Sequence, residues 1–258
     1  MIENRINGIP VFEFPNLAGV SGLRHGVFTR RGGYSEGPFQ SLNVAYSVAD
    51  RPENVEKNRR AILQVMGAKR IVFVQQVHGR EVVVFSQEKT EEGDTGPDWS
   101  AQGDAIISDV PGVSLAIQTA DCQSILLCDP VRRAVGNIHS GWRGSIQNII
   151  GHTVARMAAV FGTRAQDLLA GIGPSLGPCC AQFIHYRREI PESLWQYNLG
   201  NNHFDFLSMS RDQLQIAGVP ADHIAVSNLC TRCRTDLFFS YRAEKITGRF
   251  AAVIGLDG

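Results

Sequence analysis

The sequence has no excess of either charge and no long hydrophobic run. Lys and Arg number 25, as do Asp and Glu, so the formal net charge of this 258-residue chain is zero. Without a basic field there is no general attraction for nucleic acid or for an anionic lipid surface. No apolar stretch reaches the roughly 18 residues of a membrane span, and the segment MIENRINGIPVFEF lacks the apolar core of a signal peptide. We therefore expect a cytoplasmic protein with no nucleic-acid and no membrane partner.

Cysteine and histidine are also sparse, with 6 and 7 residues. In a chain of this size without an export signal, an even number of cysteines is a weak indication of disulfides, so we expect reduced thiols. Reduced thiols can bind a metal. The cysteines are Cys122, Cys128, Cys179, Cys180, Cys230 and Cys233.

The composition is that of a globular domain, with 43% hydrophobic and 19% charged residues. No repeat of fixed period and no Pro/Ser linker divides the chain. We predict one α+β domain spanning residues 1–258, with packed mixed β-sheets flanked by helices, as a monomer or homodimer.

Runs rich in β-branched residues predict the strands. RIVFVQQV (70–77) and EVVVF (81–85), separated by HGR, predict a β-hairpin with a short turn. Several later runs are apolar on both faces, so helices or a second sheet should cover them. Further extended segments are predicted at 25–30, 43–48, 104–109, 113–119, 123–129, 132–140, 167–173, 223–229 and 250–256.

Two helices have start and stop signals. We expect the first to be capped by Asp50 and to run to about Met66, and the second to be capped by Ser145 and to run to about Phe161, each followed by a glycine. The polar stretch 86–103 predicts a surface loop. Shorter helical pieces are predicted at 187–197 and 208–217.

Three side chains that suit a metal stand at predicted strand ends. They are His78 in QQVHG, Cys122 in TADCQ and His139 in GNIHSGW. Catalytic zinc takes three protein ligands and keeps a fourth position open, and both His and Cys are suitable ligands. The spacings match no compact metal motif, and such residues also occur as surface histidines and small core cysteines. The pattern therefore suggests a zinc site without excluding a structural role.

The segments QQVHG, DAIIS, TADCQSILLCDP, GNIHSGWRG and GIGPSLGPCC, in this order, resemble the bacterial YfiH-like family, also called the multicopper polyphenol oxidoreductase or laccase-domain family. The resemblance implies an α/β sandwich-like single domain. It also implies Zn²⁺ on His78, Cys122 and His139, because the matching residues are zinc ligands in that family. The resemblance extends over 25–43, 58–60 and 238–249 as well.

The same resemblance implies a zinc-dependent purine nucleoside enzyme. It would convert adenosine, inosine or methylthioadenosine with phosphate to base plus ribose 1-phosphate, and it would deaminate adenosine. Deamination needs a water activated by the metal, whereas phosphorolysis needs a cradle for the phosphate anion. The expected partners are therefore a nucleoside and phosphate.

Candidate catalytic residues follow from these two needs. Asp121 and Asp104 are the carboxylates nearest in sequence to the proposed ligands, and each is a candidate proton shuttle. The alternative is that Asp104 only bonds loop amides and that Asp121 only orients a ligand. Arg143, just before a predicted helix, is a candidate for holding phosphate. The substrate-binding candidates that rest on the resemblance alone are Asn43, Arg59 and Arg30.

The sequence departs from the family at two places. Gln123 and Ser124 stand where the family often has Pro or Val, and the segment after the Cys pair reads AQF. Both affect the pocket rather than the ligands. A structural site formed by Cys179-Cys180 and Cys230-x-x-Cys233 is not expected, because adjacent cysteines are poor simultaneous ligands.

Other function classes fit the same residues. Cys122 with His78 or His139, oriented by Asn137 or Asp121, would make a Cys-His hydrolase. A copper-dependent phenol oxidase is a further alternative, although a coupled copper cluster needs many closely spaced imidazoles and the 7 histidines are scattered. A metal-dependent sensor that binds nucleoside without turnover is the non-enzymatic alternative.

Overall fold

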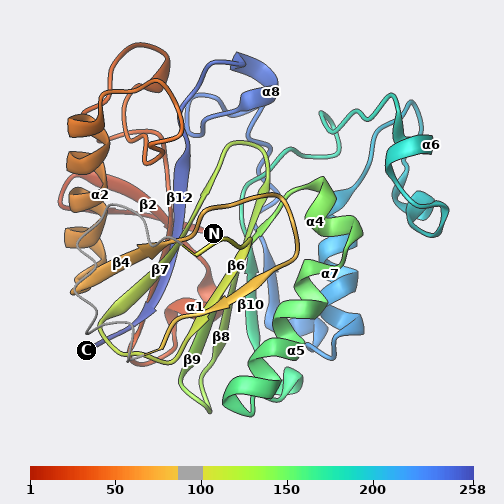
Figure 1. The fold of residues 1–258 in the computed structure, drawn as a ribbon, viewed down its shortest axis with the longest axis horizontal. Coiled ribbons are helices and arrows are strands. Elements are labelled where there is room, and N and C mark those ends of the chain that lie inside the picture. Colours follow the sequence, from red (N-terminus) through yellow and green to blue (C-terminus); the bar gives the residue numbers. More distant parts are fainter. Residues whose placement is uncertain (87–100) are drawn as a thin grey trace.

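Two mixed β-sheets pack face to face in the computed structural model, which describes residues 1–86 and 101–258 (Figure 1). One sheet has the strand order β1-β2-β3-β12-β7-β4 and the other the order β11-β10-β8-β9-β6-β5. Within them, β4 with β7, β5 with β6 and β10 with β11 are parallel pairs. The strands are β1 (Ile2–Ile6), β2 (Ile9–Glu13), β3 (Leu23–Phe28), β4 (Arg70–Phe73), β5 (Val82–Val84), β6 (Ala105–Ser108), β7 (Val113–Thr119), β8 (Gln123–Asp129), β9 (Ala134–Ser140), β10 (Leu169–Ile172), β11 (Ile224–Val226) and β12 (Phe250–Leu256).

Helices cover the outer face of each sheet. Figure 1 shows α2 against the sheet that contains β4 and β7, and α5 and α7 against the sheet that contains β8 and β9. The helices are α1 (Pro15–Ala18), α2 (Pro52–Met66), α4 (Trp142–Ile146), α5 (Ile149–Phe161), α6 (Tyr186–Glu189), α7 (Phe206–Ile216) and α8 (Tyr241–Glu244), with 3₁₀ turns at Gly37–Phe39, Ala165–Asp167, Glu192–Tyr197 and Ala221–His223. The layers therefore run helix, sheet, sheet, helix.

The strand period of two explains why the central runs are apolar on both faces. In β8, Leu126 points into the core between the sheets, whereas its neighbours Ile125 and Leu127 pack with the residues of α5. In β12, Ala252 and Ile254 likewise face the other sheet. The prediction of an α+β fold with packed mixed sheets and flanking helices is confirmed, and the runs 113–119, 123–129 and 250–256 are strands over their full predicted lengths.

The predicted hairpin of 70–77 with 81–85 is wrong. β4 pairs with β7 in one sheet, and β5 pairs with β6 in the other. The connection between them crosses from sheet to sheet, and its turn is fixed by a distant carboxylate, because the backbone N–H groups of His78 and Gly79 donate to Asp104 at 2.9 and 2.6 Å. A local turn signal cannot reveal such a crossover.

Both predicted helix caps are also wrong. α2 follows Arg51 without a side-chain cap, and Asp50 instead accepts hydrogen bonds from Ser35 and Asn43. The second predicted helix is two helices, and α5 is capped by Asn148, whose side chain accepts from the Gly151 amide. The Asp50 side chain bonds to residues distant in the chain and therefore does not cap α2.

The N-terminal strands and the segment 43–48 differ from expectation as well. β1 and β2 form a hairpin around Asn7 and Gly8, which have φ values of 51° and 82°. Asn-Gly is the usual signal for such a turn, and the prediction missed it. Residues 43–48 form no strand. The Ala45 amide donates a hydrogen bond to Asn43 Oδ1 at 3.1 Å, and this local bond replaces the pairing that a strand would need.

Some predictions fall at the edge of what the structure covers. Residues 87–100 of the predicted loop 86–103 lie outside the described residues. Among the helices that are described, none is long and apolar enough to cross a membrane.

His25 in β3 makes stability depend on pH. Its side chain is buried, and Nε2 accepts a hydrogen bond from the Phe14 amide at 2.8 Å, which requires a neutral ring. Burial lowers the pKa of His25 from 6.5 to about 4. The folded state therefore disfavours the proton, and the stability that the neutral ring contributes is lost as pH falls from 6.5 towards 4.

We expect the His25→Gln variant to lose less stability than wild type between pH 7 and pH 4.5. The difference should be roughly 2 to 3 kcal/mol in the free energy of unfolding. Urea denaturation at both pH values measures it. The exposed His185, replaced in the same way, is the control and should leave the pH dependence unchanged. Equal pH dependence in wild type and His25→Gln would contradict the assignment.

Candidate metal centre and its pocket

His78, Cys122 and His139 meet at one end of the two sheets. Their ligand atoms all lie within 4.8 Å of one another. The rings of His78 and His139 stand edge to face, with centroids 4.9 Å apart. The three residues come from the crossover after β4, the β7–β8 turn and strand β9. Two imidazoles and one thiolate at this separation form a donor set for one metal ion with an open fourth position.

The backbone around the centre allows the three ligand side chains to come close together. His78 and Asp121 both have positive φ values, 61° and 93°, so each ligand turn is tight. At Gly141 a Cβ atom would lie 3.1 Å from the His78 ring and 3.2 Å from the Cys122 sulfur. A larger residue at this position would crowd the ligand triangle.

Asp104 holds two of the three ligands. Its side chain is fully buried, and Oδ1 accepts a hydrogen bond from His139 Nδ1 at 2.8 Å. It also accepts from the His78 amide, which sets the turn that carries the His78 ring. Burial raises the pKa of Asp104, but the hydrogen bonds from His139 and the amides outweigh it and hold the pKa below its usual range. The ionised carboxylate therefore directs His139 Nε2 towards the centre.

We expect Asp104→Asn to weaken metal binding at this centre by about 10 to 100-fold, because the amide carries no charge and its NH₂ group would face backbone N–H donors. Competition with a chelator of known zinc affinity measures this loss. Asp109→Asn changes an exposed carboxylate near the end of β6 and should leave metal binding at the centre as in wild type. Unchanged affinity in Asp104→Asn would show that the buried carboxylate does not tune the ligands.

The ligands also shift one another's protonation. Burial raises the pKa of the Cys122 thiol, but the charges and hydrogen bonds of His139 and His78 outweigh it and lower the pKa to about 6. For His139, burial lowers the pKa, whereas Cys122 and Asp104 raise it, to about 9. Both shifts favour a thiolate beside an imidazolium in the metal-free protein, and the thiolate is the form that binds a metal.

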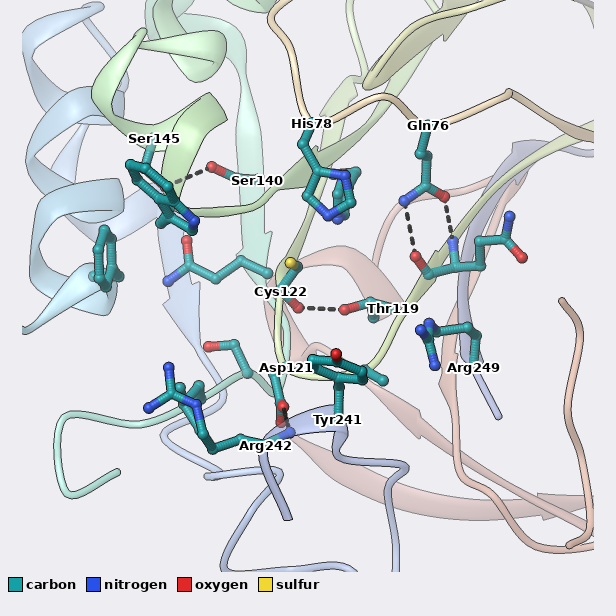
Figure 2. A pocket seen from close by; sticks show the side chains of 18 of the residues that line it. Gln76, His78, Thr119, Asp121, Cys122, Ser140, Ser145, Tyr241, Arg242 and Arg249 are labelled. Carbon is teal, nitrogen blue, oxygen red and sulfur yellow. Dashed lines mark hydrogen bonds between the residues drawn. The ribbon is translucent and has the colours of Figure 1, made fainter. Parts of the chain in front are cut away.

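The centre lies in the wall of a cavity of about 500 Å³. This volume suits a small organic molecule. Figure 2 shows His78 and Cys122 beside each other, with Tyr241, Arg242 and Arg249 on the other walls. The remaining lining residues are Ser47, Gln76, Gln118, Thr119, Ala120, Asp121, Gln123, His139, Ser140, Trp142, Ser145, Ser175, Leu176, Ala181, Phe183 and Phe206.

Several polar atoms of this lining have no protein partner. Gln118 Oε1, Gln123 Nε2 and Ser175 Oγ are buried, and no hydrogen bond within the described residues satisfies them. At Gln123 the other end of the amide accepts from Ser210 Oγ, so the NH₂ group is oriented. Buried groups without partners cost stability, and such groups in a cavity wall are suited to bind a polar ligand.

The structure separates the two carboxylates proposed from the sequence. Asp121 lines the cavity, and its oxygens accept from Thr231 Oγ1 and from the Arg242 amide, both at 2.6 Å. Asp104 lies behind the ligands and is not among the cavity residues of the described chain. Their catalytic roles stay predictions.

Arg143 lies outside the described cavity lining. Its side chain is exposed, and the guanidinium stacks over the Trp142 ring at 4.6 Å. Its role in holding phosphate stays a prediction.

The three substrate-binding candidates support the loops behind the pocket. Arg30 pairs with Glu244 at 2.8 Å, and Arg59 Nε donates to the Val44 carbonyl at 2.8 Å. Asn43 Oδ1 accepts from the Arg249 amide at 2.8 Å, which positions a cavity residue. None of Arg30, Arg59 and Asn43 is in the lining as far as the chain is described, and contact with substrate stays a prediction for all three.

The sequence-based assignment missed Arg242 and Arg249, the two arginines of the lining. Burial lowers the pKa of Arg249, while the charges of Cys122 and Asp121 raise it. Arg242 Nη1 donates to the Gln182 carbonyl at 2.9 Å. Both residues lie in FFSYRAEKITGR, a segment of the resemblance, which was the available signal.

Fold and site together define a class, the two-sheet α+β proteins with an open His-Cys-His centre at one end of the sheets. The family model described as multi-copper polyphenol oxidoreductase laccase matches residues 24–257. This chain therefore belongs to the laccase-domain family, and the resemblance found in the sequence is confirmed.

Named relatives agree with this assignment. The chain is 35% identical over 250 residues to purine nucleoside phosphorylase YlmD of Geobacillus stearothermophilus, covering 91% of this chain and 90% of the relative. It is 31% identical over 238 residues to purine nucleoside phosphorylase YfiH of Escherichia coli strain K12, covering 88% and 91%. The crystal structure of YlmD from G. stearothermophilus superposes with a TM-score of 0.87 at 32% identity, over 99% of this chain and 98% of that chain.

Proposed function

We propose that this protein is a zinc-dependent purine nucleoside phosphorylase that also deaminates adenosine. The observation that carries the proposal is the open set of His78, Cys122 and His139 in the wall of a cavity of about 500 Å³. Relatives that cover about nine tenths of the chain are named purine nucleoside phosphorylases, which supports the first activity. The proposed substrates are adenosine, inosine and methylthioadenosine, with phosphate.

The donor set fits zinc. His nitrogen and Cys thiolate are its usual ligands, and three of them with an open position are typical of catalytic sites. The close approach at Gly141 and the carboxylate partner of His139 support the same fit. When bound, zinc would supply a Lewis acid at the cavity wall.

Different residues of the cavity would bind the purine and the phosphate. The aromatic rings of Tyr241 and Phe183 offer flat apolar surface for a purine. The oriented amide of Gln123 offers an N–H donor to the base. Arg249 and Arg242 supply positive charge for phosphate. This arrangement would hold phosphate and nucleoside in one cavity, as an attack on the ribose requires.

We assign proton transfer to Asp121 and positioning to Asp104. Asp121 is the carboxylate that lines the cavity, and each of its oxygens retains a lone pair beyond the hydrogen bonds from Thr231 and Arg242. Asp104 acts through His78 and His139, which it orients.

An assay of nucleosides over a phosphate titration tests the proposal. Zinc-loaded protein should release base from inosine and adenosine with a rate that saturates in phosphate, and ribose 1-phosphate should form in equal amount. Inosine should form from adenosine without phosphate. Base release that does not depend on phosphate would indicate hydrolysis, and no turnover of any purine nucleoside would refute the proposal.

A Cys-His hydrolase is the second candidate, because Cys122, His139 and Asp104 are aligned as a nucleophile, a base and an orienting carboxylate. Alkylation with iodoacetamide distinguishes the hydrolase from the zinc enzyme. A free nucleophile would be alkylated in freshly purified protein, whereas a thiolate bound to zinc would be shielded and would react after chelation. Rapid alkylation with zinc present would favour the hydrolase.

Copper-dependent phenol oxidation, suggested by the family's description, has less support. A coupled copper cluster needs more imidazoles than the two at this centre, and no second histidine cluster occurs within residues 1–86 and 101–258. Phenol turnover that rises with added copper would reverse this ranking.

A further inference from the structure

A second cluster of metal-binding side chains lies apart from the His-Cys-His centre. The sulfurs of Cys179, Cys180, Cys230 and Cys233 all lie within 4.8 Å of one another. This differs from the expectation that adjacent cysteines do not act together. Strands β10 and β11 are parallel neighbours, so the loops that follow them run side by side.

Backbone pairing holds the two loops in register. Ser175 pairs with Cys230 in an isolated bridge, and the Thr231 amide donates to the Ser175 carbonyl at 2.9 Å. Gly177 permits the closest approach, because a Cβ atom there would lie 2.9 Å from Cys230 Cβ. The fold, rather than chain proximity, therefore assembles the four thiols.

The distances between sulfurs are those of a tetrahedral site. Cys233 Sγ lies 3.7 Å from Cys179 Sγ and 3.6 Å from Cys180 Sγ. Four sulfurs at about 2.3 Å from one zinc ion are about 3.8 Å apart. A disulfide needs about 2.0 Å between two sulfurs, and here Cys233 is nearly equidistant from two candidates, so no pair is selected.

The surroundings also suit thiolates that bind a metal. The Gly177 amide donates to Cys230 Sγ at 3.3 Å, as backbone amides do around metal-bound thiolates. Cys180 is buried, Cys230 is half-buried, and Cys179 and Cys233 are exposed, so an ion can enter from solvent. The Cys-x-x-Cys spacing of 230 and 233 is that of many structural zinc sites.

We propose that these four thiolates bind a second zinc ion in a closed, structural site. Four protein ligands leave no open position, in contrast to the three-ligand centre. The ion would tie together the loops that form the cavity wall, because Ala181 and Phe183 follow one Cys pair and Arg242 follows the other. Arg242 Nη1 already joins them through its hydrogen bond to the Gln182 carbonyl.

Metal analysis of matched variants tests this site independently of the proposed enzyme activity. Protein purified with a thiol reductant and freed of loose metal should contain about two zinc ions per chain. Cys230→Ser with Cys233→Ser should retain about one, and so should His78→Ala with His139→Ala. Cys128→Ala changes a buried cysteine outside both clusters and should retain two. A wild type with one zinc, lost in the histidine variant and kept in the cysteine variant, would overturn the proposal.

Cobalt substitution makes the test independent of the folding of the cysteine variant. In His78→Ala with His139→Ala, Co²⁺ at a four-thiolate site should give strong sulfur-to-metal charge transfer in the near ultraviolet, together with intense visible bands of tetrahedral cobalt. A thiol titration of the protein, unfolded in the presence of a chelator, should find all four cysteines reduced. Absence of the cobalt bands, or a disulfide among the four, would refute the site.

Discussion

If the proposed function holds, His139→Ala should lose the metal of the His-Cys-His centre and about 10³-fold or more of the phosphorolysis of inosine. The imidazole is buried between Cys122 and Asp104, so its loss removes a ligand and leaves Asp104 without its partner. A Lewis acid supplies several kcal/mol of transition-state stabilisation, and about 1.4 kcal/mol corresponds to tenfold in rate. Zinc content and kcat/KM for inosine measure the two losses.

His152→Ala is the matched control for this variant. His152 is exposed, contacts Arg80 and belongs neither to the ligand set nor to the described cavity lining, so zinc content and rate should stay at wild-type values. Full zinc at the centre together with full activity in His139→Ala would show that the ligand set is wrong. Loss of zinc with full activity would show that the metal is structural there.

Arg249→Met should raise the phosphate concentration needed for half-maximal phosphorolysis by about 10 to 150-fold. Removing one charge-assisted contact costs about 1.5 to 3 kcal/mol, and methionine retains much of the apolar stem. Deamination of adenosine needs no phosphate and should fall much less. Initial rates of base release and of inosine formation, each over a phosphate titration, separate the two reactions.

Arg143→Met decides between the sequence-based and the structure-based candidates for phosphate. Arg143 stacks on Trp142 outside the described lining, whereas Arg249 lines the cavity. We expect Arg143→Met to leave the phosphate dependence near that of wild type. Weakened phosphate use in Arg143→Met alone would assign the anion site to Arg143 after all, and equal loss of both reactions in Arg249→Met would assign Arg249 to the nucleoside.

Much of the fold could be predicted because burial leaves a periodic signal. The runs at 113–119, 123–129 and 250–256 are central strands, covered on both faces, and the continuous apolar pattern identified them. The sequence predicted a hairpin at 70–85 that does not form, because β4 and β5 belong to different sheets. Which strand pairs with which depends on contacts between distant segments, and the local turn residues do not encode them.

The candidate site shows the same division. Family-specific motifs pointed to His78, Cys122 and His139, and the structure brings these three together. Arg249 lies in a segment of the resemblance, but only the fold shows that it lines the cavity. Its backbone amide donates to Asn43 Oδ1, about 200 residues earlier, and such a long-range contact leaves no spacing pattern in the chain.

The sequence by itself determined the class of protein, since ordered motifs and apolar periodicity are properties of neighbouring residues. Only the tertiary structure determined which metal-binding side chains come together. The pairing of β10 with β11 gathers Cys179 and Cys180 with Cys230 and Cys233, and buried Asp104 orients two histidines of the other centre. Both depend on sheet packing that brings distant turns within a few ångströms, and this packing is a property of the whole folded chain.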